Sequence, residues 1–219
     1  MTRPAQLPKS PAARRGSRRA RPRLRGARAA TAALLAALSG SATAQQALAE
    51  RFETCLACHG PGGVSQLALT PSLAGQHSFY AITQLFLFRE GRRNSETMTA
   101  MAKGMTDADL RDFSDLIAKL PASSAAADTP ADATRVSAGR ALAQLFRCAS
   151  CHGADFAGGQ QVRRIGGQRE DYLQKALSEF NVGQRIGYTP AMNEVMVGIQ
   201  PTELADLAHY VSHLPKTGR

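Results

Sequence analysis

The sequence predicts an all-α protein built from two tandem copies of one helical unit. A five-residue pattern, Cys-x-x-Cys-His, occurs at residues 55–59 and again at 148–152, and these two copies contain all 4 cysteines of the chain. When the sequence is shifted against itself by 92 to 94 residues, the segments that follow the motifs also align. Self-similarity at a fixed period indicates a repeated structural unit. The period-2 alternation that would predict strands surrounds neither motif.

Each unit is expected to contain three main helices. In the first unit they cover residues 46–57, 78–90 and the segment that begins at the capping signal Thr106–Asp109; in the second they cover 135–149, 170–182 and the segment that begins at Pro201. Gly91 and Gly183 follow the second helix of each unit, and glycine just past a helix end is a common C-cap. The third helix carries an apolar stripe at helical spacing in both units, which predicts one face packed on a core.

The segment between the units has the composition of a linker. Residues 122–133 contain only Ala, Ser, Asp, Thr and Pro and no large apolar side chain. We therefore expect a first domain over residues 45–121, a linker over 122–133 and a second domain over 134–219.

The positive charge of the chain is confined to its beginning. The formal net charge is +10, but residues 1–44 hold ten Lys and Arg and no acidic residue, so residues 45–219 are formally neutral. The folded part therefore has no basic excess for binding nucleic acid. Within 1–44, a basic stretch, a short apolar run and Ala42-Thr43-Ala44 predict a signal peptide that is cleaved near Ala44 on export to the periplasm. The alternative is a basic tail with an anchor helix.

The duplicated motif predicts the cofactor. Cys-x-x-Cys-His is the attachment signature of c-type haem, so the chain is expected to bind two covalent haem c groups. The cysteines that form the thioethers are Cys55, Cys58, Cys148 and Cys151, and the first axial ligands of the irons are His59 and His152. Two covalent haems indicate a protein that transfers electrons. A unit of about 80 residues is also small for a core of its own, and haem supplies apolar bulk.

Other uses of the cysteines fit less well. Exported cysteines can form disulfides. A zinc site needs four ligands, whereas each motif offers two thiols and one histidine. A thiol-exchange motif needs a βαβ setting, which neither copy has.

The repeat also selects the second axial ligands. At the local offset of 94 residues, Met98 aligns with Met192, and only this pair keeps a thioether in both units. We therefore expect Met98 and Met192 to bind the irons, since methionine is a common distal ligand. The remaining candidates are expected to fill the haem pocket or the core: Met101, Met105 and Met196.

The other histidines and four arginines of the second unit are expected at the surface. His209 and His213 lie four residues apart, as a metal pair would, but they align with charged Asp115 and Lys119, so a solvated face is favoured. His77 aligns with Arg169 and receives the same interpretation. Four arginines give the second unit a positive balance that could dock an acidic partner, with a solvated face as the alternative: Arg163, Arg164, Arg169 and Arg185.

Taken together, these residues resemble those of the tandem class I dihaem cytochromes c, the cytochrome c4 type. The resemblance covers nearly all of residues 46–215 and rests on both haem motifs, on the stretches 71–76, 91–93 and 98–101, and on 165–168. It implies two cytochrome c folds that face each other across a pseudo-twofold axis, with haem propionates hydrogen-bonded near the interface. It also implies electron delivery to a terminal oxidase.

One position departs from the family pattern. In this family a proline carbonyl accepts a hydrogen bond from the proximal histidine, and Pro71 suits that role in the first unit. Its counterpart in the second unit is Arg163. The resemblance therefore puts the second proximal hydrogen bond in question, and we predict that the two haems differ in reduction potential.

These observations lead to a periplasmic electron shuttle with no catalysis of its own. Its expected partners are redox proteins that donate and accept electrons, among them a membrane-bound oxidase or dehydrogenase, and peripheral membrane association remains open. The alternative is the cytochrome subunit of a thiosulfate, sulfide or alcohol dehydrogenase, or a peroxidase-like enzyme with one labile distal ligand. Methionines in both distal positions favour the shuttle.

Overall fold

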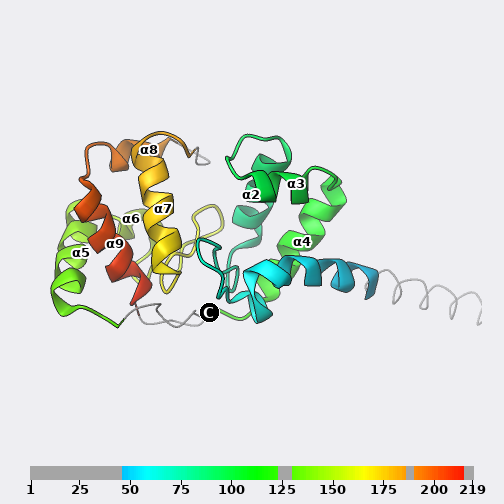
Figure 1. Cartoon of the computed structure of the whole chain (residues 1–219), viewed down its shortest axis with the longest axis horizontal. Coiled ribbons are helices and arrows are strands. Elements are labelled where there is room, and N and C mark those ends of the chain that lie inside the picture. The colour runs from blue at the N-terminus through cyan, green and yellow to red at the C-terminus, as the bar shows by residue number, and fades with distance from the viewer. Residues whose placement is uncertain (1–45, 123–129, 186–189, 215–219) are drawn as a thin grey trace, which may run out of the picture. The chain divides into compact units, whose positions relative to one another are not determined.

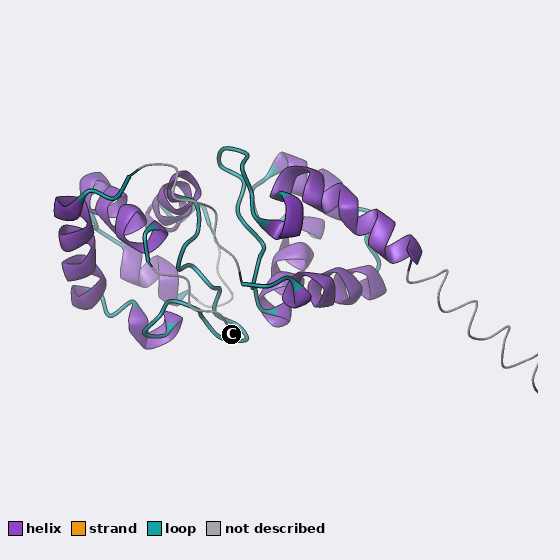
Figure 2. Ribbon diagram, turned by 90° about the horizontal axis from the view of Figure 1, so that it is seen from below, coloured by secondary structure: helices purple, strands orange, loops and turns teal. Residues whose placement is uncertain are grey.

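The computed structural model describes residues 46–122, 130–185 and 190–214. The predicted signal peptide, most of the predicted linker and the last five residues lie outside this part of the chain. All regular secondary structure in the described residues is helical (Figure 2), as the sequence predicted. Their helices are too short or too polar for any of them to cross a membrane.

The first half, up to residue 122, contains the three predicted helices and two short additional ones. Its first helix is described from residue 46 and ends at residue 59, the last residue of the haem motif. The remaining elements are η1 (Pro61–Gly63), α2 (Ser78–Arg89), α3 (Glu96–Ala102) and α4 (Asp107–Lys119). Their apolar faces enclose a core centred on Phe52, Leu85, Leu110 and Phe113. The short helix α3, which carries Met98, was not predicted from the sequence.

The second half repeats this plan with one break. Its elements are α5 (Ala133–Leu145), α6 (Ala149–His152), α7 (Glu170–Asn181), α8 (Ala191–Met196) and α9 (Pro201–Ser212). The prediction of one continuous helix over 135–149 was wrong, because the chain turns at residues 146–148 and Arg147 has a φ of 53°. Figure 1 shows α5, α9 and α7 side by side, and α9 contacts both of its neighbours.

Local chemistry accounts for where the main helices begin and how closely they pack. At the start of α4, the Thr106 hydroxyl accepts from the Asp109 backbone N–H (3.1 Å) and the Asp109 carboxylate accepts from the Thr106 N–H (2.8 Å), which is the predicted capping box. In α5, a Cβ at Gly139 would lie 2.2 Å from the backbone oxygen of Asp206. Glycine at this position therefore sets how closely α5 and α9 approach.

Two glutamines bind the halves together in a reciprocal way. The side-chain amide of Gln168 accepts from the backbone N–H of Ser72 (2.8 Å) and donates to its carbonyl (2.9 Å). Gln76 does the same to Arg164, accepting from its N–H (3.1 Å) and donating to its carbonyl (2.7 Å). Gln76 and Gln168 are counterparts in the sequence repeat, so the exchange follows the internal symmetry. All four residues are buried.

Candidate functional site

A cavity in the second half collects the residues that the haem motif predicts. It has a volume of about 250 Å³ and is lined by Cys148, Cys151, His152 and Met192. Apolar side chains from α7, α8 and α9 form much of the wall, and α2 of the first half also contributes to it through Tyr80, Thr83 and Gln84. A mostly apolar cavity that contains two thiols, an imidazole and a thioether has the donor set for a covalently attached haem.

Both proximal histidines are buried and oriented by a backbone carbonyl. His59 Nδ1 lies 2.8 Å from the oxygen of Pro71, and His152 Nδ1 lies 3.1 Å from the oxygen of Arg163. A carbonyl only accepts, so Nδ1 donates, and Nε2 keeps the lone pair that an iron requires. Burial lowers the pKa of both imidazoles, which favours this neutral form.

The expectation that Arg163 puts the second proximal hydrogen bond in question was wrong. The acceptor is a main-chain oxygen, so the bond does not depend on the identity of the side chain. Arg163 stands in the second half where the first half has Pro71, and its carbonyl still accepts the hydrogen bond from the proximal histidine.

The candidate distal methionines differ in their surroundings. Met98 on α3 is half-buried against the core of the first half, and Met192 on α8 lines the cavity of the second. Met196 also lines this cavity but is fully buried in a core cluster, and Met105 packs on the core as expected. Met101 is 42% exposed, so it does not pack in the core, and its place in the haem pocket stays a prediction. Asn193 on α8 donates to the Arg185 carbonyl (2.9 Å) and so fixes this short helix.

The four arginines expected on a solvated face, where they could have docked an acidic partner, are instead buried. Arg163, Arg164, Arg169 and Arg185 are each at most 9% exposed. Arg164 donates to the Gly75 carbonyl (3.4 Å) in the first half, and Arg169 pairs with Asp171 (2.9 Å). Their charge therefore lies at the contact between the halves and cannot form a docking surface.

Arginines and tyrosines alternate across this contact. Arg93 donates to the Tyr172 hydroxyl (2.8 Å), and its repeat counterpart Arg185 donates to the Tyr80 hydroxyl (3.4 Å) and to Tyr172 (3.3 Å). Burial alone would raise the pKa of Tyr172, but the guanidinium groups of Arg185, Arg93 and Arg163 outweigh it and lower that pKa. Tyr80 and Tyr172 are counterparts at a shift of 92 residues, which is a sequence signal for this cluster but does not reveal its function.

The buried charges provide a test of whether haem fits here. Among the described residues, Arg93 and Arg163 have no carboxylate within ion-pair distance, and Nε of Arg163 is buried without a hydrogen-bond partner. A buried cation is costly unless an anion compensates it. Haem carries two propionate carboxylates, so the surplus positive charge beside the cavity fits a bound haem.

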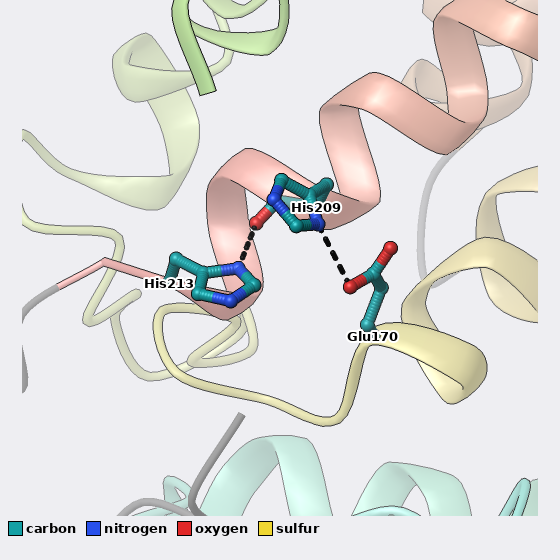
Figure 3. Close-up of side chains that lie close together, drawn as sticks. All are labelled: Glu170, His209 and His213. Atoms are coloured by element: carbon teal, nitrogen blue, oxygen red, sulfur yellow. Dashed lines mark hydrogen bonds and ion pairs between the residues drawn. The ribbon is translucent and has the colours of Figure 1, made fainter. Parts of the chain in front are cut away.

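The interpretation of His209 as a solvated side chain was wrong (Figure 3). His209 on α9 is 1% exposed, its Nε2 accepts from the backbone N–H of Asp132 (2.9 Å), and its Nδ1 lies 2.9 Å from a Glu170 oxygen. The donor at Nε2 requires the ring to carry its proton on Nδ1, so His209 has no lone pair left for a metal ion. This network ties α5, α7 and α9 together. His77 is also partly buried, with Nε2 3.0 Å from the Ala157 carbonyl.

Comparison with known proteins agrees with this geometry. The sequence profile of the cytochrome c family matches residues 42–121 and 136–215. The cytochrome c4 of Thiocapsa roseopersicina is 32% identical over 167 residues, which cover 73% of this chain and 86% of that protein. A thiosulfate dehydrogenase electron acceptor of Thiomonas intermedia is 31% identical over 164 residues, covering 71% of this chain and 76% of that protein.

A solved structure shows the same arrangement of both halves. Reduced cytochrome c4 from Pseudomonas stutzeri superposes with a TM-score of 0.69 at 26% identity, covering 78% of this chain and 98% of that one. The duplicated motif, the two helical halves and these relatives agree, and the chain belongs to the cytochrome c family as a dihaem electron carrier of the cytochrome c4 type with two haem c groups.

Proposed function

We propose that this protein is a periplasmic shuttle that carries electrons between respiratory redox proteins. His59 and Met98 bind one iron, and His152 and Met192 bind the other. The main support is the cavity of the second half, where both motif cysteines, the oriented His152 and Met192 line one apolar space. With both axial positions filled, each iron cycles between ferric and ferrous without binding a substrate.

The surface around the attachment cysteines supports exchange with a partner protein. Cys58 and Cys151 are exposed, whereas Cys55 and Cys148 are half-buried. A haem bonded to an exposed cysteine has one edge at the protein surface. Electrons can cross that edge to a docked protein while the iron stays enclosed, as a shuttle requires.

The proposal of export rests on residues 1–44, whose basic stretch, apolar run and Ala42-Thr43-Ala44 are typical of a cleaved signal. The domain boundaries at 45–121 and 134–219 belong to the same proposal, with 122–133 as the linker. Covalent haem attachment is consistent with an exported protein, and a membrane-bound oxidase is the proposed final acceptor of the electrons.

The likeness to a thiosulfate dehydrogenase electron acceptor favours a second candidate. In that function the protein would receive electrons from a thiosulfate-oxidising enzyme and pass them on. This candidate changes only the donor, since the haem sites and the acceptor stay the same.

A spectrum and a reduction assay test these proposals. The ferric protein is expected to be fully low-spin, with methionine–iron charge-transfer absorption from both haems; a high-spin fraction would indicate an open distal position and favour catalysis. The reduced protein is then mixed with membranes that contain a terminal oxidase, and we expect the oxidase to oxidise both haems. Reduction of the oxidised protein by thiosulfate plus its dehydrogenase, but not by thiosulfate alone, would support the second candidate.

A further inference from the structure

One buried charge beside the haem cavity has no charged counterpart in the other half. Arg93 and Arg185 are repeat counterparts, and each lies over a phenylalanine ring, with 4.3 Å from Arg93 to the Phe88 centroid and 5.0 Å from Arg185 to that of Phe180. Arg163 has no such counterpart, because the first half has a proline at the matching position. We infer that Arg163 raises the reduction potential of the second haem and makes it the electron-receiving end of the chain.

Arg163 is placed where its charge is poorly screened. It is 9% exposed and lines the cavity of the second half. Its guanidinium lies over two rings, 5.1 Å from the centroid of Tyr172 and 5.7 Å from that of Tyr80. Its Nε has no partner in the described part of the chain. Water contributes little here, so the field of this cation reaches the haem cavity at low effective dielectric.

The sign of the effect follows from the reaction. Reduction adds one electron to a haem, and a nearby positive charge stabilises the reduced form more than the oxidised form. This holds whether the guanidinium stands alone or pairs with a propionate, because in both cases it makes the surroundings of the haem more positive by one charge. The second half therefore holds the electron more strongly than the first.

Another charge in the second half opposes this effect only weakly. Glu179 lies 3.7 Å from Arg185 but also pairs with Lys175, and its side chain is 22% exposed. Its negative charge is therefore shared with two cations and screened by water. Position 87, its counterpart in the first half, is a leucine.

Two other buried arginines of the second half also lack an arginine as counterpart, since Arg164 aligns with Ser72 and Arg169 with His77. Arg169 pairs with Asp171, and neither of the two lines the cavity, whereas Arg163 does.

This inference rests on the proposed pair of six-coordinate haems, and spectroelectrochemical titration of the intact dihaem protein tests it. Met98→His and Met192→His variants assign each redox wave to its haem, because a histidine in place of the methionine lowers the potential of that haem alone. The test variant is Arg163→Gln, which removes the charge and keeps the carbonyl that orients His152. Arg163→Lys keeps the charge, and Arg140→Gln removes an exposed charge from the same half as a control.

In half-reduced Arg163→Gln protein, we expect the ratio of molecules reduced at the second haem to molecules reduced at the first to fall about tenfold. This corresponds to a decrease of about 59 mV in the potential of the second haem relative to the first. Arg163→Lys is expected to retain most of the wild-type difference, and Arg140→Gln nearly all of it. Pro71→Arg provides the reciprocal test if Arg163→Gln fails to fold, and it should raise the potential of the first haem.

An Arg163→Gln variant with both haems intact and unchanged potentials would overturn the inference, as would an equal shift of both waves. Fewer than two low-spin haems in the wild-type protein would instead refute the proposed ligand set. The two failures are therefore distinguishable.

Discussion

Replacing Gln168 with leucine should weaken the contact between the halves by an amount that the structure allows to be estimated. The Gln168 amide satisfies both backbone groups of Ser72, at 2.8 Å and 2.9 Å, and Ser72 is buried. Leucine has a similar size but no polar atom, so it leaves a buried N–H and a buried carbonyl without partners. Each such group costs about 1–3 kcal/mol, so the free energy of unfolding should fall by about 2–6 kcal/mol.

Urea unfolding of the haem-loaded protein, followed by circular dichroism and by haem absorbance, measures this change. Gln76→Leu leaves the backbone N–H and carbonyl of Arg164 without their partners, so a similar decrease in the free energy of unfolding is expected. Gln174→Leu, at an exposed position of α7, is the control and should change the free energy of unfolding by no more than about 0.5 kcal/mol. A Gln168→Leu protein as stable as this control would refute the reasoning.

Three further substitutions test the packing and capping described above by the same urea assay. Asp109→Asn removes the carboxylate of the capping box and its 2.6 Å bond to Arg51, and should cost about 1 kcal/mol. The hydrogen bond from Arg51 lowers the pKa of Asp109 to about 2. The stability contributed by the Asp109 carboxylate is therefore fully present above the ordinary pKa of an aspartate and is lost as the pH falls through about 2. An Asn variant that loses stability in acid as steeply as the wild-type protein would contradict this. Gly139→Ala places a methyl against the Asp206 carbonyl and should cost about 1–3 kcal/mol, whereas a neutral effect would show that α5 and α9 can separate freely. His209→Leu leaves the N–H that precedes α5 without its acceptor, with an expected loss of about 1–3 kcal/mol; a gain in stability would refute the structural role of this network.

The sequence repeat predicted the parts of the structure that depend on local pattern. The two haem motifs, the three main helices of each half and the capping box at Thr106 all follow from residue spacing. The structure confirms these helices and the capping box, apart from the break at 146–148 in the helix predicted over 135–149. The offset of the repeat also separated Met98 and Met192 from their rivals, and this choice stays a prediction. Periodicity is informative here because each main helix buries one apolar face.

Burial of polar side chains did not follow from the sequence. Arg163 and Arg185 were assigned to the surface because charged residues are usually exposed, yet both lie at the contact between the halves. His209 was judged by its aligned partner Asp115, although in the second half the chain before α5 covers this position. Such placements depend on which surfaces meet, and a single sequence gives little information about contacts over long range.

The short helices α3 and α8 were missed for a different reason. Each contains seven residues or fewer, which is too short for a helical period to emerge from a sequence. Both carry the candidate distal methionines, so the part of the haem site that is hardest to predict is the part that completes the coordination of iron.

The central claim is that two haems are attached to this chain and that each iron is held by one histidine and one methionine. Haem quantification together with ferric absorption spectra of the Met98→Ala, Met192→Ala and Met101→Ala variants tests it most directly. We expect two covalent haems per chain in the wild-type protein, loss of half of the methionine–iron charge-transfer absorption in each of the first two variants, and no loss in Met101→Ala, since that side chain is exposed. A single haem per chain, or an unchanged absorption in Met98→Ala or Met192→Ala, would contradict the claim.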